Sequence, residues 1–411
     1  MQKLIGNAIV GQSGGPTAAI NSTLSGVIRG ALANPEIEHI YGAFNGVEGI
    51  LNGTFRTIDA DFACEDKLRL LENTPAAALG SCRYKLPKKG EGEEIYTQLF
   101  NTFAANNIRY FFYIGGNDSM DTVDKISAHA IKIGYDMRVV GVPKTIDNDL
   151  EGTDHTPGFG SAAKYIAASM QEVIRDCAVY TVKAVTIVEI MGRDAGWLAA
   201  SAALPSLYCG VVPDLVYLPE RAFVMEEFFE DIRAALEIKP NIVIAVSEGI
   251  RFADGTYVGA GAQSGAADTF GHQYLSGTGK ALEYAVKDAL GCKVRSVELN
   301  ILQRCASHIA SKTDLEEGVA IGKAAVDAAL GGASHCMMAF KRVSAEPYEI
   351  AIQPEDISGI ANKVRRVPDE FINARGNGVT QECLRYILPL IEGETAPVYE
   401  RGLPVHLVIE R

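Results

Sequence analysis

The sequence has no excess of positive charge: 51 acidic residues outnumber 38 lysines and arginines, giving a formal net charge of −13 at pH 7. Surfaces that bind nucleic acid are normally basic, so this balance argues against such a partner. Apolar runs of membrane-spanning length are also missing, and the apolar part of the N-terminus is too short for a signal peptide. We therefore expect no membrane or nucleic-acid partner. An anionic small substrate is still compatible with the sequence, because lysines and arginines cluster locally.

The eight cysteines form no CxxC pair and no other metal-ligand spacing. That usage fits a reduced, cytoplasmic compartment. The 41 glycines follow no repeat, and hydrophobic residues make up 47% of the chain, as in a globular protein. A chain of 411 residues exceeds what one hydrophobic core usually supports, so we expect two lobes.

Apolar runs typical of buried strands alternate with helical patterns along the chain. The predicted strands cover residues 3–11, 37–44, 110–114, 137–142, 184–190, 241–246, 294–299, 335–343 and 348–352. The predicted helices cover residues 18–32, 65–71, 94–107, 120–133, 158–179, 226–238, 315–330 and 379–391. Such alternation predicts an α/β class with a largely parallel sheet. Residues 252–276, rich in Gly, Ala and Ser, are expected to form a mobile loop.

Residues 141–149, Gly-Val-Pro-Lys-Thr-Ile-Asp-Asn-Asp, concentrate the most chemistry. They follow a predicted strand, and open parallel sheets bind ligands at the carboxyl ends of their strands. Two carboxylates, a hydroxyl and an ammonium group are too polar to be buried unpaired. The segment therefore predicts a site for a polar ligand or metal ion, with a solvated turn as the alternative on composition alone.

Other strand ends carry similar polar turns. Residues 11–17, between a strand and a helix, could cradle a phosphate through main-chain amides, or could be purely structural. The paired glycines in residues 115–119 indicate close approach of a ligand to the backbone. The basic stretch 79–85 either holds phosphate or is a solvated loop. Later strands end at 191–197, which contains an arginine, and at 247–249, which contains a glutamate.

Five turns, taken in order, resemble the phosphofructokinase family: Gly-Gly near the start, GGND, PKTIDND, MGR and a late QR. The resemblance runs from about residue 5 to 304, and the remainder looks like the longer, pyrophosphate-using branch. It implies two Rossmann-like lobes with mainly parallel sheets. Residues 1–158 plus about 303–390 would form a larger lobe for the phosphoryl donor, and about 159–302 plus 391–411 a smaller lobe for fructose 6-phosphate.

The resemblance also implies roles for individual residues in a reaction of glycolysis. Asp147 matches the general base on the 1-hydroxyl of fructose 6-phosphate, and Arg193 matches an arginine near the sugar and the moving phosphoryl group. The matched sugar contacts are Thr145, Asp149, Met191, Gly192 and Glu248, and the arginines matched to the 6-phosphate are Arg295 and Arg304, one of which usually reaches in from a neighbouring subunit. A homodimer or homotetramer is therefore expected.

On the donor side, Gly15 matches the glycine beside the phosphoryl donor and Arg83 an arginine that bridges the two substrates. Ser119, together with Asp118 and Lys144, is also expected to bind pyrophosphate. The family implies Mg²⁺ as cofactor, for which Asp118 is the first expected ligand and Asp149 a further candidate.

Asp118 and Lys144 bear on the choice of donor, because ATP-using members resemble GGDG and PGTIDND at these positions. A carboxylate at Asp118 would oppose the α-phosphate of a nucleotide, at a cost of about 4 kcal/mol for like charges about 4 Å apart. Lys144 would supply a cation for compact pyrophosphate. The resemblance thus implies a reversible pyrophosphate-dependent reaction. The alternatives are an ATP-dependent 6-phosphofructokinase, a noncatalytic phosphosugar sensor, and another acceptor such as sedoheptulose 7-phosphate.

Four positions depart from the family pattern. Asn117 stands where most members have an aspartate associated with Mg²⁺, and Ile301 where many bacterial members have a histidine on the 6-phosphate. Ala184 replaces an arginine that crosses the subunit interface, with a lysine beside it. Ser25 replaces an arginine of the bacterial effector site, which argues against nucleotide regulation there.

Overall fold

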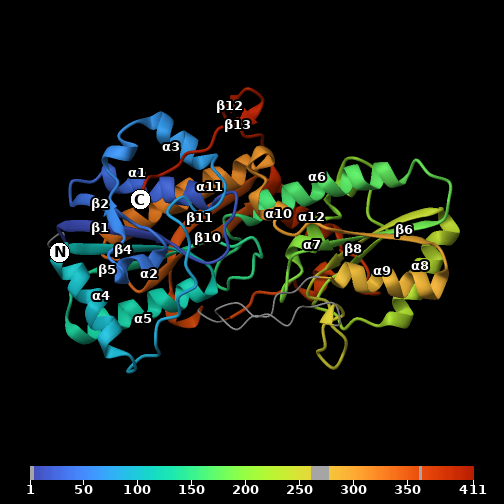
Figure 1. Cartoon of the computed structure of the whole chain (residues 1–411), viewed down its shortest axis with the longest axis horizontal. Coiled ribbons are helices and arrows are strands. Elements are labelled where there is room, and N and C mark those ends of the chain that lie inside the picture. The colour runs from blue at the N-terminus through green and yellow to red at the C-terminus, as the bar shows by residue number, and fades with distance from the viewer. Residues whose placement is uncertain (1–3, 261–276, 361–362) are drawn as a thin grey trace.

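Two sheets, each covered by helices on both faces, lie side by side in the computed structural model of the chain (Figure 1). The structure describes residues 4–260, 277–360 and 363–411. Within those ranges, none of the helices combines the length and the apolar character needed to cross a bilayer.

The larger lobe is built on a seven-stranded sheet in the order β11-β10-β5-β4-β1-β2-β3. Its strands are β1 (Gly6–Gln12), β2 (Ile37–Ala43), β3 (Phe55–Thr57), β4 (Ile108–Gly115), β5 (Arg138–Pro143), β10 (Cys336–Ala345) and β11 (Tyr348–Asp356). The neighbours from β10 to β2 are parallel, whereas β3 and β11 at the two edges run antiparallel to their partners.

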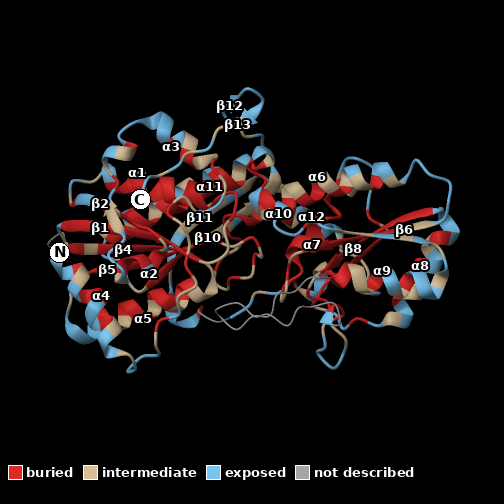
Figure 2. Ribbon diagram, in the orientation of Figure 1, coloured by how far each residue is buried: buried red, intermediate tan, exposed pale blue. Residues whose placement is uncertain are grey.

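Side chains alternate between the two faces of this sheet, so each face packs on its own set of helices. One core contains α1 (Ile20–Leu32), α3 (Glu65–Glu72) and α11 (Lys312–Leu330). The other contains α2 (Gly46–Leu51), α4 (Glu93–Ala105) and α5 (Asn117–Ile133). The central strands β1 and β4 between them are almost wholly buried (Figure 2).

The smaller lobe has a four-stranded parallel sheet in the order β7-β8-β6-β9. Its strands are β6 (Ala184–Ile190), β7 (Leu215–Tyr217), β8 (Asn241–Ser247) and β9 (Lys293–Glu298). One face packs on α6 (Phe159–Cys177), α7 (Trp197–Ser201) and α12 (Gln381–Ile387), and the other on α8 (Met225–Ile238) and α9 (Thr278–Leu290).

Register brings the polar turns of the larger lobe to one edge. Gln12 pairs with Ile114 on β4, and Gly115 pairs with Pro143 on β5, so β1, β4 and β5 end at the same level. Parallel strands therefore deliver three glycine-rich or charged turns to a single line.

The predicted α/β class and mainly parallel sheets are confirmed, and the strand ends agree within a few residues. The short elements β3, β7 and α2 were not predicted, because three to six residues carry little periodic signal. The last helix is shorter than expected, since α12 gives way to a 3₁₀ turn at Leu388–Ile391. Most of the loop predicted over residues 252–276 lies outside the described residues.

Near the C-terminus, the structure differs from the expected lobe assignment at two places, helix α12 and the last residues of the chain. Helix α12 packs on α7 of the smaller lobe, although residues up to about 390 were expected on the larger one. The last residues lie on the larger lobe: Leu407 N donates to Thr74 Oγ1, and Arg56 donates to the carbonyl of Glu410. Apolar packing accounts for both places: Leu384 and Ile387 of α12 are buried in the core of the smaller lobe, and the partly buried Leu407 and Ile409 pack against the core of the larger one. The remaining predicted boundaries stay a prediction.

Candidate active site

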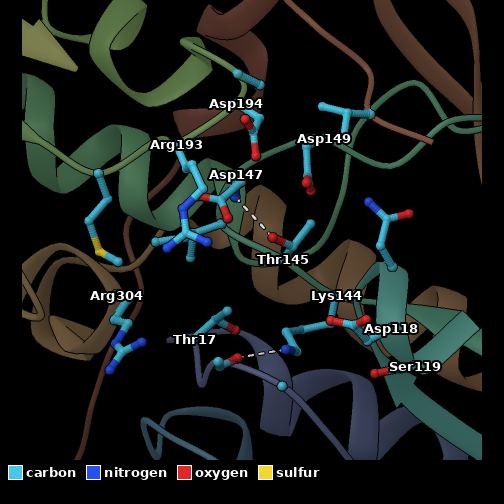
Figure 3. Close-up of a pocket in the computed structure, with 18 of the residues that line it drawn as sticks. Thr17, Asp118, Ser119, Lys144, Thr145, Asp147, Asp149, Arg193, Asp194 and Arg304 are labelled. Atoms are coloured by element: carbon cyan, nitrogen blue, oxygen red, sulfur yellow. Dashed lines mark hydrogen bonds between the residues drawn. The ribbon is translucent and has the colours of Figure 1, made fainter. Parts of the chain in front are cut away.

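A cavity of about 430 Å³ lies where the strand ends of the two lobes meet. Four cations and five carboxylates line it, so it is suited to a charged ligand and not to an apolar one (Figure 3). The lining residues are Gly14, Gly15, Pro16, Thr17, Arg83, Gly116, Asn117, Asp118, Ser119, Lys144, Thr145, Ile146, Asp147, Asp149, Met191, Arg193, Asp194, Ala195, Glu248, Arg304 and Val364.

Of the described residues predicted for the site, Gly192 and Arg295 are the two that do not line the cavity. Gly192 is nonetheless adjacent, because its N–H donates to Glu248 Oε1 at 3.3 Å. Arg295 is exposed on β9, the edge strand of the smaller sheet. Sequence reasoning assigned no individual role to Thr17, Asp194 or Val364. The first two lie within the polar turns 11–17 and 191–197, whereas Val364 lies in no motif.

The turn after β5 directs its polar groups into the cavity. Thr145 Oγ1 accepts a hydrogen bond from the N–H of Asp147 at 3.1 Å, and Ile146 is buried as an apolar anchor. Asn148 then adopts a left-handed backbone with φ of 53°. Asparagine tolerates this conformation better than most residues. As a result Asp147 and Asp149 both face the cavity while Asn148 is buried (Figure 3).

Lys144 is the most deeply buried cation of the site, with 2% of its surface exposed. Its Nζ donates to the carbonyl oxygen of Gly15 at 2.6 Å, as the dashed line in Figure 3 shows. Burial lowers the pKa of Lys144 to about 7, an effect that Asp147 opposes and Arg304 reinforces. Its charge at neutral pH therefore depends on whether an anion is bound.

The pKa values of the carboxyl groups are shifted upwards, in the opposite direction to that of Lys144. Burial raises the pKa of Asp147, against the pull of Arg193 and Lys144. Burial, with repulsion from Asp147, raises the pKa of Asp149 to about 7 and that of Glu248 to about 8. Several partly buried acids with raised pKa values mark a functional site more often than a structural one. They also mean that added cations would stabilise the charged forms.

The wall opposite Lys144 is formed by the loop after β6. Arg251 Nη2 donates both to the carbonyl of Arg193 and to Asp194 Oδ1, each at 2.9 Å. The backbone of Arg193 is thereby fixed, while its side chain extends beside Asp147 (Figure 3). Sequence reasoning did not identify Arg251, which lies 58 residues further along the chain.

The loop after β1 leaves an open cradle beside these cations. A Cβ atom built on Gly14 would lie 3.4 Å from Lys144 Nζ, and one built on Gly15 would lie 3.5 Å from Arg304 Nη1. Side chains at these positions would occupy the space next to two positive groups. Glycine keeps that space free for an anion.

The donor set fits Mg²⁺ only in part. Asn117 Oδ1 is buried and has no hydrogen-bond partner, and the Asn117 side chain acts to lower the pKa of Asp149 against the effect of burial. Asp118 is the next residue on the same helix start. Among the described residues, however, no three His, Cys, Asp or Glu side chains are grouped to hold an ion. Since Mg²⁺ takes few protein ligands and adds phosphate oxygens, these residues fit an ion that arrives with a phosphate substrate.

Comparison with known proteins gives a consistent set of relatives. The sequence model described as phosphofructokinase matches residues 7–329. The chain is 43% identical over 407 residues to a pyrophosphate–fructose 6-phosphate 1-phosphotransferase of Halomonas elongata, covering 97% of this chain and 94% of the relative. The structure of a pyrophosphate-dependent phosphofructokinase from Nitrosospira multiformis superposes with a TM-score of 0.88 at 37% identity, covering 98% of this chain and 95% of that one. A second, from Marinobacter aquaeolei, gives 0.87 at 38% identity, covering 99% and 98%.

Proposed function

The chain belongs to the phosphofructokinase family, and we propose that it transfers a phosphoryl group from pyrophosphate to the 1-hydroxyl of fructose 6-phosphate, giving fructose 1,6-bisphosphate and phosphate. The observation that carries this conclusion is the placement of Asp147 in one cavity with Lys144, Arg193 and Arg304. A base and a set of cations around an anion-sized space are what phosphoryl transfer requires. The reaction is readily reversible, because pyrophosphate is a modest donor.

In this mechanism Asp147 accepts the proton of the 1-hydroxyl as its oxygen attacks phosphorus. Arg193 beside it neutralises charge on the transferred group, and Lys144 does so from the side of the Gly14–Gly15 loop. Such fixed charges act strongly in a site that excludes water. The raised pKa of Asp147 suits proton transfer near neutral pH.

The choice of donor rests on Asp118 and Lys144, together with the relatives. Both residues line the cavity, at the start of α5 and at the end of β5. The carboxylate of Asp118 disfavours the additional phosphate of a nucleotide. Lys144, buried against Gly15, provides positive charge to a small anion. The relatives named above are described as pyrophosphate enzymes.

We include Mg²⁺ in the proposal, held by Asp118 and Asn117 with Asp149 close by, and bound together with the phosphates. When present, the ion would screen the charge on the transferring group. The unpartnered Asn117 Oδ1 supports its placement here.

We also propose that the enzyme is a cytoplasmic homodimer or homotetramer. The exposed position of Arg295 on an edge strand supports a role in the site of a neighbouring subunit, where it would contact the 6-phosphate.

Steady-state assays of the purified protein with Mg²⁺ and fructose 6-phosphate test the proposal. We expect turnover with pyrophosphate and little with ATP. Activity with ATP alone would make the enzyme an ATP-dependent 6-phosphofructokinase, and no activity with either donor, despite sugar binding, would favour the sensor. Sedoheptulose 7-phosphate is assayed in parallel as acceptor.

A further inference from the structure

Asn148, between the two aspartates of the catalytic turn, is held from outside the cavity. Only 1% of its surface is exposed, and its φ of 53° lies in the left-handed region. Its Nδ2 donates to the hydroxyl oxygen of Tyr386 on α12 at 3.1 Å. The backbone of this residue sets the directions of Asp147 and Asp149, so whatever fixes Asn148 also fixes both carboxylates.

The hydroxyl of Tyr386 uses its full hydrogen-bonding capacity at this point. It donates to the carbonyl of Asp154 at 2.5 Å, and it accepts from Asn148 Nδ2 and from Arg365 Nη2, the latter at 3.2 Å. A phenol has one donor and two acceptor positions. Removing the oxygen would therefore leave the buried Asn148 Nδ2 and the partly buried Arg365 Nη2 without this partner.

Arg365 extends this support to the opposite wall of the site. Its N–H donates to the carbonyl of Asp149 at 2.8 Å. Its own carbonyl accepts from Trp197 Nε1 at 3.1 Å, and its guanidinium lies 4.4 Å from the centre of the indole ring. Trp197 begins α7, directly after the loop that carries Arg193. One residue thus contacts both the turn of the base and the helix behind the catalytic arginine.

We propose that Tyr386 and Arg365 are positioning residues that set the placement of Asp147 relative to Arg193 during phosphoryl transfer. Within the described parts of the chain, neither side chain lines the cavity, so they act through the turn and not on the substrate. The catalytic part of this inference rests on the proposed function. A base displaced by about 1 Å can cost roughly 100-fold in rate, whereas binding contacts made elsewhere stay in place.

The test compares Tyr386→Phe with Tyr348→Phe. Tyr348 is a matched control because its hydroxyl is also buried against a partner, Glu317 Oε1 at 2.7 Å, and its ring also faces the Arg342 guanidinium, at 5.1 Å against 4.5 Å for Tyr386. It does not bond to the catalytic turn. Tyr386→Phe is expected to lower kcat about 10- to 100-fold, with both KM values within about twofold. Tyr348→Phe should lose comparable thermal stability but keep kcat.

Amide hydrogen exchange on the substrate-free proteins gives a readout that needs no activity. Tyr386→Phe should speed exchange across residues 147–150, and Tyr348→Phe should not. If the wild-type protein had no turnover with pyrophosphate, the proposed function would fail. The rates of amide exchange over residues 147–150 would still test whether Tyr386 positions the turn. Equal kcat values in the two variants, or unchanged exchange over 147–150 in Tyr386→Phe, would overturn the proposal.

Should Tyr386→Phe not fold, Arg365→Lys takes its place with the same expected results. Lysine keeps the charge and the main-chain bond to Asp149 but loses the planar fork that reaches Tyr386.

Discussion

The ammonium group of Lys144 donates to the main-chain carbonyl of Gly15 over 2.6 Å, which joins the turn after β5 to the loop after β1. An ammonium group has three donors. Within the described ranges this carbonyl is its hydrogen-bond partner, so the other donors are available to an anion. A buried cation with a pKa of about 7 is therefore placed beside the open space at Gly14 and Gly15.

This arrangement predicts a pH-dependent use of pyrophosphate. Since the pKa of Lys144 is lowered to about 7, the free enzyme loses this positive charge as pH rises above 7. We expect kcat/KM for pyrophosphate to fall over pH 7–8.5. In Lys144→Arg, whose guanidinium stays charged, that decline should be absent even if activity is lower throughout. Pyrophosphate itself titrates equally in both assays, so parallel profiles would contradict the assignment.

Asp147→Asn should lower kcat by about 10²- to 10⁴-fold, the usual contribution of a positioned base, with little change in KM for fructose 6-phosphate. The fold should be retained, because the raised pKa of Asp147 shows that its charge is a cost to the folded state. Kinetics and thermal melting measure the two effects. Unchanged turnover would support a noncatalytic sensor.

The double change Asp118→Gly and Lys144→Gly tests the choice of donor. Loss of the lysine removes charge stabilisation, which we expect to reduce kcat/KM for pyrophosphate by roughly 10²- to 10³-fold. Loss of the carboxylate should raise ATP use. Competition assays with both donors measure the ratio of kcat/KM for pyrophosphate to kcat/KM for ATP. If that ratio were unaltered in the double variant, neither residue would determine the choice of donor.

Gly15→Ala should raise KM for the donor several-fold without loss of stability. The added methyl lies 3.5 Å from Arg304 Nη1 and so enters the space for the anion, while no main-chain atom obstructs it. Gly359→Ala is the control, since a Cβ there meets nothing within 4 Å. A donor KM that rises equally in both variants would be inconsistent with a cradle at Gly15.

Glu248→Gln should alter the pH dependence of stability. A carboxyl whose pKa is raised to about 8 in the folded protein stabilises it fully below its unfolded value near 4.5, and that contribution is lost as pH rises to 8. Relative to the variant, wild type should lose up to about 1.4 kcal/mol of unfolding free energy per pH unit over that window. Urea unfolding of the two proteins at pH 5, 6 and 7 without Mg²⁺ measures this change in unfolding free energy. If the unfolding free energies of wild type and variant changed equally with pH, the raised pKa of Glu248 would be refuted.

Local pattern was sufficient to predict the longer strands of both sheets and the polar turns that follow them, although it missed the three-residue strands β3 and β7. The run at 137–142 and its charged continuation mark β5 and the position of Asp147, because strand burial and strand-end chemistry are both encoded by adjacent residues. The order of the motifs added the partners of Asp147 in the site, such as Lys144 and Arg193. The two arginines matched to the 6-phosphate could not be separated by pattern alone: Arg304 lines the cavity, whereas Arg295 does not.

The contacts of Tyr386 and Arg365 with the catalytic turn could not be predicted from the sequence. Tyr386 lies in a helix that reads as an ordinary amphipathic end of the chain, and Arg365 lies in a segment without periodic pattern. Their contacts with Asn148 span 238 and 217 residues. Such long-range pairings depend on how the two lobes pack, which no local pattern encodes.

The strand order has a consequence for synthesis on the ribosome. Strand β5 ends at residue 143, but its neighbour β10 begins at residue 336. At roughly 5–20 residues per second, the nascent chain carries β5 as an open edge for about 10–40 seconds, and open edges pair readily with other chains. Tyr386 emerges later still, so the support of the catalytic turn forms only after β10 has been synthesised to cover this edge.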